Sequence, residues 1–324
     1  MKRFLAHSFL IGLSAFSLNA LAQGSSNFPD RSVRIIVPFG AGGATDIISR
    51  TVGQKLSEMW KQPVVVDNRS GANGNIGASD AAKSAPDGYT LLMATSSHAI
   101  NATLYKNLNY SLSQDFVALS NLAFVPLVLV VNPAIPANTV KELATYAKAN
   151  SGTLNFGSGG VGTAAHLAGE LFNTETGSKM LHVPYKGGAL AMNDLLGGQI
   201  QVMFANLPEA NNQIKASKLR ALAVTGDQRN PQQPAVSTFS ESGFPTIDLK
   251  SWFGLFVPKG TPTAIVQKLS TDISAAVQDP AVQKKLTEIG SEPVGSKTEQ
   301  FQPFVNNEIT RWGGLIKQSG ATAQ

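Results

Sequence analysis

The sequence predicts an α/β fold built from two similar domains. Three observations predict it: β-branched runs alternate with helical segments, glycine-rich loops join many of them, and the same order restarts near residue 153. The length of 324 residues also suits two domains of roughly 150 residues each better than a single core. The sequence contains no Cys, which excludes a disulfide scaffold, thiol catalysis and thiolate metal sites.

The first 22 residues are typical of a secretory signal peptide. Lys2 and Arg3 precede an apolar run over 4–21, and Ala20-Leu21-Ala22 supplies a small-x-small cleavage site. Polar residues interrupt the run, which disfavours the alternative of a retained membrane anchor. We expect the mature chain to begin near Gln23 and to lie outside the cytoplasm.

The first half of the chain predicts repeated units of strand, loop and helix. β-branched and apolar runs indicate the strands, and apolar residues at helical spacing indicate the helices. Such alternation is typical of a parallel sheet. The predicted strands are 33–38, 64–67 and 90–94, the helices are 45–60 and 76–83, and the loops are 39–43, 68–74 and 95–98.

The second half repeats this order and ends in helices. The segment 228–243 is rich in Pro, Gln and Ser and is predicted to be a loop. The predicted strands are 124–131, 153–156, 180–183, 200–204, 222–224 and 251–257; the helices are 140–149, 163–176, 189–196, 265–278, 280–289 and 300–318; the glycine loops are 157–162 and 184–188.

The two blocks are expected to be joined by two crossing strands. The apolar strands 124–131 and 251–257 stand at the block borders, where the chain would leave the first domain and return to it. The first domain is then discontinuous. We expect domain I to comprise 28–127 and 251–324, and domain II to comprise 128–250.

The glycine loops indicate an anion site between the domains. Strand-to-helix loops of a parallel sheet meet at one edge, and helix N-termini there offer free N–H groups and partial positive charge. A single such loop is more often a tight turn without a ligand, but several on one edge favour a site. The loops at 39–45 and 157–163 contain no Lys or Arg and no Gly-Lys-Ser/Thr motif. They suit a carboxylate or another small polar group better than a triphosphate.

No cofactor is expected from the sequence. The loop 157–162 matches G-x-G-x-x-G, which is a weak signal for a dinucleotide site. Such a site also needs an acidic residue at the end of the next strand, and 182–185 has none. A Rossmann enzyme is therefore disfavoured.

Catalytic and metal sites are not expected either. The histidines of the mature chain, His98, His166 and His182, show no metal-ligand spacing, and no nucleophile elbow occurs. His98 and His166 are expected either to line the cleft or to cap a helix, and His182 is expected to be structural. Asp46 has three open roles: complementing the helix dipole, binding an ammonium or amide group of a ligand, or bracing the glycine loop.

The basic charge is not a nucleic-acid footprint. The formal net charge of +5 includes Lys2 and Arg3, and without them the chain has 24 basic and 21 acidic residues. The basic residues are scattered, with no run longer than Lys284-Lys285. A nucleic-acid partner is therefore not expected.

Six motifs in order carry a resemblance to a known family. They are VPFGAGG at 37–43 with Asp46, NRSGANG at 68–74, PDGY at 86–89, YKGG at 185–188, DLLGG at 194–198 and WFGLFVP at 252–258. With these motifs, essentially the whole mature chain resembles the tripartite tricarboxylate transporter substrate-binding proteins, also called the Bug family of periplasmic receptors.

The resemblance implies a two-domain periplasmic-binding-protein fold, a Venus flytrap with the ligand in the interdomain cleft. In that family the first glycine loop holds a ligand carboxylate, which points to Phe39, Gly40, Ala41, Gly42 and Gly43. The rest of the ligand would meet Ser96, Ser97, His98, Ser158, Gly159, Thr163 and His166, with Tyr185, Lys186 and Asn206 as further candidates. Two departures affect the pocket: Ser96-Ser97 replaces a frequent Gly-Thr pair, and Gly188-Ala189-Leu190 lacks a frequent Pro.

The expected function is that of a monomeric periplasmic receptor for a small carboxylated compound. It would deliver that ligand to the large and small membrane subunits of a tripartite transporter. Two alternatives stay open from the sequence: a subunit that presents its ligand to a membrane sensor, and a secreted α/β enzyme using Asp46 or His98 as an acid or base.

Overall fold

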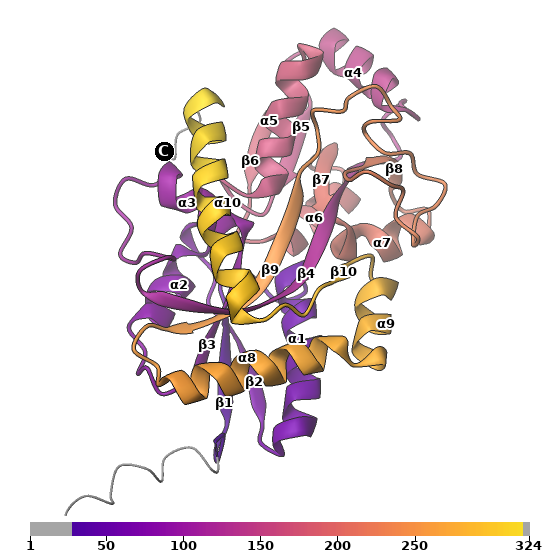
Figure 1. Cartoon of the computed structure of the whole chain (residues 1–324). Coiled ribbons are helices and arrows are strands. Elements are labelled where there is room, and N and C mark those ends of the chain that lie inside the picture. The colour runs from indigo at the N-terminus through magenta and orange to yellow at the C-terminus, as the bar shows by residue number, and fades with distance from the viewer. Residues whose placement is uncertain (1–27, 320–324) are drawn as a thin grey trace, which may run out of the picture.

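The computed structural model describes residues 28–319, which form an α/β fold around one ten-stranded sheet (Figure 1). The α/β class predicted from the sequence is confirmed. The predicted signal peptide at 1–22 lies outside the described residues. None of the helices in 28–319 is long and apolar enough to cross a membrane.

The first block of the chain forms a parallel part of the sheet with helices between its strands. The order is β2-β1-β3, and both β2 and β3 run parallel to β1. Each strand is followed by a helical segment, as predicted for β1 and β2. The elements are β1 (Val33–Val37), α1 (Ala44–Trp60), β2 (Val64–Asn68), η1 (Ala72–Gly74), α2 (Asn75–Ala82), β3 (Thr90–Thr95) and α3 (Ser96–Leu104).

The third quarter of the chain forms a second parallel part, in the order β7-β5-β6. Its elements are α4 (Val140–Ala149), β5 (Asn155–Ser158), α5 (Ala164–Thr176), β6 (Leu181–Pro184), α6 (Gly188–Leu196), β7 (Val202–Asn206), α7 (Leu207–Lys215) and β8 (Arg220–Val224). We call this group lobe II.

Two long strands connect the lobes. β4 (Phe116–Val131) pairs with β9 (Lys250–Pro258) over its first part, and with β7 and β8 over its last five residues. The pairs β3–β9, β4–β9, β4–β7 and β4–β8 are antiparallel. The parallel sheet expected from the alternation of strands and helices is therefore interrupted at these strands, because β4 leaves the first block and β9 returns in the opposite direction.

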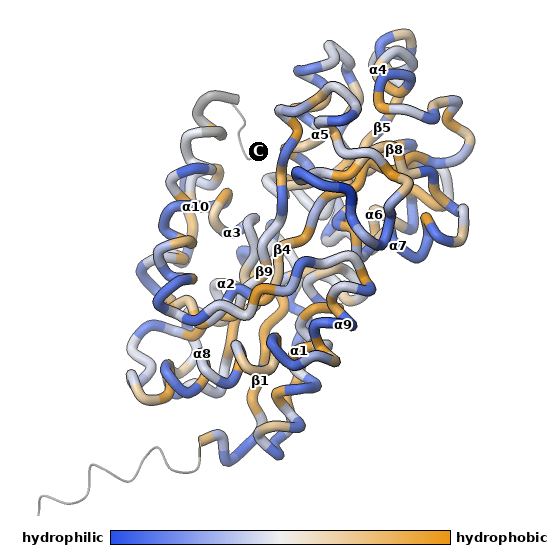
Figure 2. Tube along the Cα trace, turned by 45° about the vertical axis from the view of Figure 1, so that its right-hand side comes forward, coloured by the Kyte–Doolittle hydropathy of each residue, from blue (hydrophilic) through white to orange (hydrophobic). Residues whose placement is uncertain are grey.

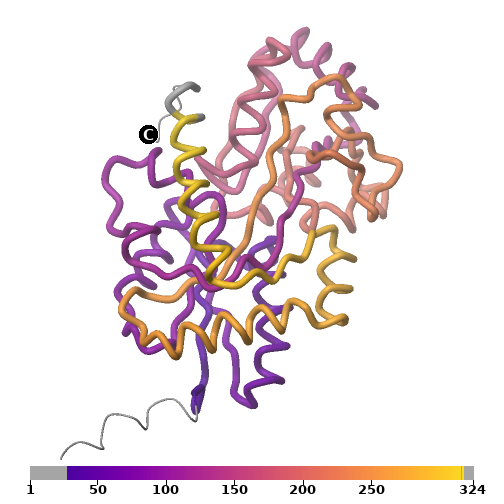
Figure 3. The backbone as a smooth tube through the Cα atoms, in the orientation of Figure 1, coloured from indigo at the N-terminus to yellow at the C-terminus, as the bar shows by residue number. Residues whose placement is uncertain are grey.

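The C-terminal elements return to the first block, and together they form lobe I. Figure 3 shows the orange-to-yellow C-terminal segments beside the indigo-to-purple N-terminal ones, with the middle of the chain in lobe II. Trp60 Nε1 of α1 donates to Asp272 Oδ2 of α8 over 2.6 Å, and Ser270 Oγ of α8 donates to the Leu119 carbonyl of β4 over 2.9 Å. These closing elements are α8 (Thr263–Gln278), α9 (Pro280–Glu288), β10 (Glu292–Pro293) and α10 (Thr298–Ser319).

Two helices were not anticipated. The predicted loop 95–98 is the cap and first turn of α3, and no helix was predicted where α7 lies. Both helices have only nine residues, and α7 is mostly polar, so neither shows a long apolar repeat. β4 also begins eight residues before its prediction, since the buried Ser120 and Asn121 interrupt its apolar pattern.

The core lies on both faces of the sheet and continues between the lobes. Figure 2 shows apolar residues along the strands and hydrophilic ones over the outer helix surfaces and loops. Ile48, Val52 and Leu56 recur on one face of α1 and are fully buried against β1. One cluster contains both Trp252 of β9 and Phe204 of β7. This shared cluster packs against both β4 and β9, the two strands that connect the lobes.

Candidate functional site

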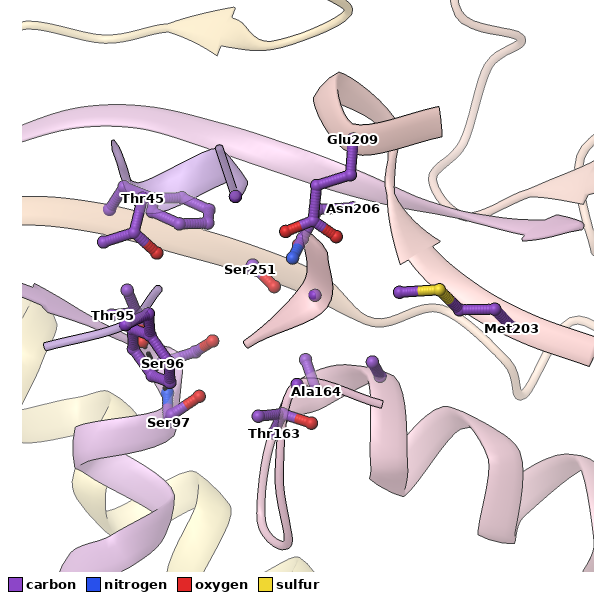
Figure 4. A pocket seen from close by; sticks show the side chains of 16 residues that line it. Thr45, Thr95, Ser96, Ser97, Thr163, Ala164, Met203, Asn206, Glu209 and Ser251 are labelled. Carbon is purple, nitrogen blue, oxygen red and sulfur yellow. Dashed lines mark hydrogen bonds between the residues drawn. The ribbon is translucent and has the colours of Figure 1, made fainter. Parts of the chain in front are cut away.

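A cavity lies between the lobes beside β9, and we call it the inner cavity (Figure 4). It has a volume of about 40 Å³, so the two lobes lie close together. Its sixteen lining residues are Phe39, Gly43, Thr45, Thr95, Ser96 and Ser97 of lobe I, Gly159, Thr163, Ala164, Ala165, Gly188, Met203, Asn206 and Glu209 of lobe II, and Ser251 and Phe253 of β9.

The first turns of five helices surround the inner cavity. Its lining includes residues at or just before the starts of α1, α3, α5, α6 and α7. Helix N-termini carry partial positive charge and N–H groups without intrahelical partners. This arrangement favours an anion in the cavity.

Two side chains at the start of α3, Thr95 and His98, cap its first turn beside the cavity. Thr95 Oγ1 accepts the Ser97 N–H over 3.2 Å, and His98 Nδ1 accepts the Thr95 N–H over 3.1 Å. His98 is fully buried, and burial lowers its imidazole pKa to about 4. His98 therefore stays neutral near pH 7 and acts as a capping residue.

The first turn of α5 repeats this arrangement in lobe II. Thr163 Oγ1 accepts the His166 N–H over 3.2 Å, and His166 Nδ1 accepts the Gly162 N–H over 3.1 Å. The His166 ring stacks on His182 with centroids 4.0 Å apart, and Ser158 Oγ hydrogen-bonds to His182 Nε2 over 2.7 Å. Burial and the neighbouring His166 lower the pKa of His182 to about 3. These groups brace the second glycine loop.

Two carboxylates, Asp46 and Glu209, accept hydrogen bonds from backbone N–H groups at the start of α1. Asp46 Oδ2 accepts the Gly42 N–H over 3.0 Å and pairs with Arg50, so it braces the first glycine loop. Although burial opposes ionisation, Arg50 and the Gly42 N–H lower the pKa of the Asp46 carboxyl. Glu209 of lobe II reaches across the cavity, and its Oε1 accepts the Ala44 N–H over 3.0 Å.

Other donors facing the cavity have no partner within the described part of the chain. Ser96 and Ser97 are 1% and 5% exposed, yet their hydroxyls form no hydrogen bond, and Figure 4 shows them directed into the cavity. The N–H groups of Ala164 and Ala165, in the first turn of α5, are likewise unbonded among residues 28–319. Such donors are suited to a ligand carboxylate.

The structure brings seven of the sixteen predicted site residues to the inner cavity: Phe39, Gly43, Ser96, Ser97, Gly159, Thr163 and Asn206. Tyr185 and Lys186 line a second, outer cavity of about 240 Å³ that shares Phe39 and Gly159 with the first. The other seven line neither cavity: Gly40, Ala41, Gly42, Asp46, His98, Ser158 and His166. Ligand contact by any of these residues stays a prediction.

Thr45, Thr95 and Gly188 lie in the predicted strand-end loops but were not singled out as site residues. Nine residues of the inner cavity are absent from the sixteen predicted: Thr45, Thr95, Ala164, Ala165, Gly188, Met203, Glu209, Ser251 and Phe253. Thr45, Ala164 and Ala165 follow glycine loops and could have been found by placing the helix starts. Glu209 could not have been found in this way, because α7 has no clear apolar repeat from which its start could be placed. No group of three His, Cys, Asp or Glu side chains placed to hold a metal ion occurs within residues 28–319.

Comparisons with known proteins agree with this geometry. Residues 48–321 match the family described as "Tripartite tricarboxylate transporter family receptor". Protein BugT of Bordetella pertussis is 38% identical over 324 residues, which span 99% of this chain and 98% of BugT.

Two solved structures are similar over nearly the whole described chain. The periplasmic binding protein BugD is 35% identical with a TM-score of 0.89, and the match covers 92% of this chain and 100% of that one. The R. palustris protein Rpa4515, solved with adipate, is 39% identical with a TM-score of 0.87, covering 90% of this chain and 98% of that one. The fold is therefore the two-domain α/β fold of periplasmic binding proteins, and the chain belongs to the tripartite tricarboxylate transporter receptor family.

Proposed function

We propose that this chain is a periplasmic receptor that closes its two lobes around a small carboxylated compound and delivers it to a membrane transporter. One observation carries the proposal: five helix N-termini meet at the inner cavity, and Ser96, Ser97, Ala164 and Ala165 offer donors there without partners. No Lys or Arg occurs among the described residues that line this cavity. Backbone N–H groups and hydroxyls would therefore hold the carboxylate.

The family supports binding rather than catalysis. Its members are receptors of tripartite transporters, and the chain is a binding protein and not an enzyme. The similar Rpa4515 was solved with adipate, a carboxylate, which supports this ligand class here. In our proposal His98 and Asp46, the candidate acid and base of the rejected enzyme alternative, act as braces of helix starts.

The membrane transporter would recognise the closed arrangement of the two lobes. The lobes touch at the cleft: a Cβ on Gly40 would lie 3.4 Å from the Lys186 carbonyl, and one on Gly187 would lie 3.1 Å from the Gly40 nitrogen. We infer that 28–127 with 251–324 and 128–250 move as two bodies about β4 and β9. Closure excludes water and strengthens each hydrogen bond to the ligand.

Export and partners complete the proposal. Residues 1–22 would act as a signal peptide that directs the chain to the periplasm. The receptor would act as a monomer, and its partners would be the large and small membrane subunits of a tripartite transporter. No observation favours the alternative of a membrane sensor.

A thermal-shift screen with paired compounds tests the ligand class. Each carboxylate is compared with its primary amide, which keeps the shape and removes the charge. A carboxylate at 100 times its Kd should add about 2.7 kcal/mol to the free energy of unfolding, and its amide should add much less. A screen in which amides stabilise the protein and no carboxylate does would overturn the proposal.

A further inference from the structure

The inner cavity contains one charged side chain of its own. Among the described residues that line it, Glu209 is the single Asp, Glu, Lys or Arg. A ligand with two carboxylates would therefore bring its second negative charge toward Glu209 with no cation lining the cavity to offset the repulsion. A ligand that carries a positive group would instead supply a cation beside this carboxylate, whose partner in the structure is the neutral Ala44 N–H.

Two acceptors on the Glu209 side are unsatisfied. Oε1 of Glu209 accepts the Ala44 N–H, but Oε2 is buried without a hydrogen-bond partner among residues 28–319. Oδ1 of the neighbouring Asn206 is also buried without a partner in the described chain. Buried acceptors are nearly always satisfied in native proteins, so both indicate a missing donor. The terminal torsion of Glu is broad, which allows either carboxylate oxygen to turn toward a ligand.

The opposite side of the cavity presents donors. Figure 4 shows Glu209 and Asn206 on one side and Ser97, Thr163 and Ala164 on the other. The unbonded hydroxyls of Ser96 and Ser97 and the unbonded N–H groups of α5 belong to that second side. The cavity is therefore bipolar, with acceptors facing donors.

We propose that the cleft selects an aminocarboxylate, whose carboxylate binds at the first turns of α3 and α5 and whose ammonium group donates to Glu209 and Asn206. This inference rests on the proposed function, since it names the ligand class of the same cleft. It assigns Glu209 a role in specificity: this residue favours the ammonium group and disfavours a second carboxylate. Burial raises the pKa of the Glu209 carboxyl, and a bound ammonium group would counter that effect.

Isothermal titration with matched compounds tests the proposal. Each set holds the aminocarboxylate, monocarboxylate and dicarboxylate of one chain length: β-alanine, propionate and malonate; γ-aminobutyrate, butyrate and succinate; δ-aminovalerate, valerate and glutarate; ε-aminocaproate, caproate and adipate. The α-amino isomers of the monocarboxylates complete the panel. In the set that binds most tightly, the wild type should prefer an aminocarboxylate to the dicarboxylate by about tenfold or more.

Two variants locate the preference. Glu209→Gln should reduce the preference for the aminocarboxylate by about tenfold, because the amide keeps the shape and loses the charge. Glu175→Gln, an exposed acid on α5 of the same lobe, should leave the preference within about twofold. Melting curves verify that each variant folds. If Glu209→Gln does not fold, the preference of the wild type for the aminocarboxylate over the dicarboxylate tests the inference by itself.

The outcomes separate this inference from the proposed function. A dicarboxylate that binds as tightly as its matched aminocarboxylate, or an aminocarboxylate preference that survives in Glu209→Gln, overturns the inference and leaves a carboxylate receptor standing. Binding of uncharged compounds with no binding of any carboxylate overturns the proposed function itself.

Discussion

The backbone N–H of Ala44 in lobe I donates to Oε1 of Glu209 in lobe II over 3.0 Å. This hydrogen bond joins the start of α1 to the first turn of α7 across the cleft, and it exists only when the lobes are together. A carboxylate from the protein thus occupies one of the anion-binding donors at the start of α1. Ligand donors are then needed mainly from α3 and α5.

Glu209→Ala should shift the lobes toward an open arrangement. A hydrogen bond to a charged acceptor contributes roughly 1.5–3 kcal/mol, and this one contributes only to the closed arrangement. Distances between spin labels placed on α2 and α6 would report the shift, with Glu175→Ala as the control. Identical distance distributions in the two variants would show that the Ala44–Glu209 contact does not hold the lobes together.

Gly40→Leu should weaken ligand binding without lowering the stability of the ligand-free protein. The backbone of Gly40 is not in the left-handed region, but a Cβ there lies 3.4 Å from the Lys186 carbonyl of the other lobe. A leucine side chain therefore obstructs closure, and we expect affinity to fall by about tenfold or more. Gly314→Leu, which faces open space on α10, is the control. Calorimetric affinities equal to those of the wild type would remove the contact between these loops from the closure mechanism.

The stability of the protein should fall as the pH falls from 6.5 toward 4. His98 has a pKa of about 4 when folded, against 6.5 when exposed, so between these values the unfolded chain binds a proton that the folded chain does not. The buried imidazole thus costs the folded state on the order of 3 kcal/mol over this window. His98→Gln, which can still accept the Thr95 N–H, should show a shallower decline in urea-unfolding free energy with falling pH. Equal slopes for variant and wild type would contradict the assignment of His98 as a neutral cap.

The sequence predicted the parts of the fold that have strong local patterns. The β-branched run at β1 and the apolar face of α1 with Ile48, Val52 and Leu56 place a strand and a helix almost to the residue. Ser96, Ser97 and Thr163 were instead implied by the family resemblance, and all three follow strand ends, which is where ligands bind in such a sheet.

The remaining site residues depend on tertiary structure. Glu209 lies on a short polar helix, and its role arises only where lobe II meets Ala44 of lobe I. Ser251 sits in an apolar strand, and its exposure to the cavity depends on the crossing of β9 between the lobes. Conversely, His98 and His166 were candidates for ligand contact, and both rings accept an N–H group at a helix start and are not among the residues that line the inner cavity. Ligand contact by either residue stays a prediction.

The central claim is that backbone donors at helix N-termini hold the ligand carboxylate, and Ala164→Pro tests it most directly. Proline is well suited to the first position of a helix, and Thr163 before it already has an extended conformation. The variant therefore removes one unbonded N–H from the inner cavity and keeps α5. Thr263→Pro, at the corresponding position of α8, is the matched control outside the cleft.

The measurement is isothermal titration of the tightest carboxylate from the screen into the wild type and both variants. Loss of a hydrogen bond to a charged ligand is worth roughly 1.5–3 kcal/mol, so Ala164→Pro should weaken binding by about tenfold or more, with unchanged melting temperature and normal binding by Thr263→Pro. Equal carboxylate affinity in Ala164→Pro and the wild type would contradict the account.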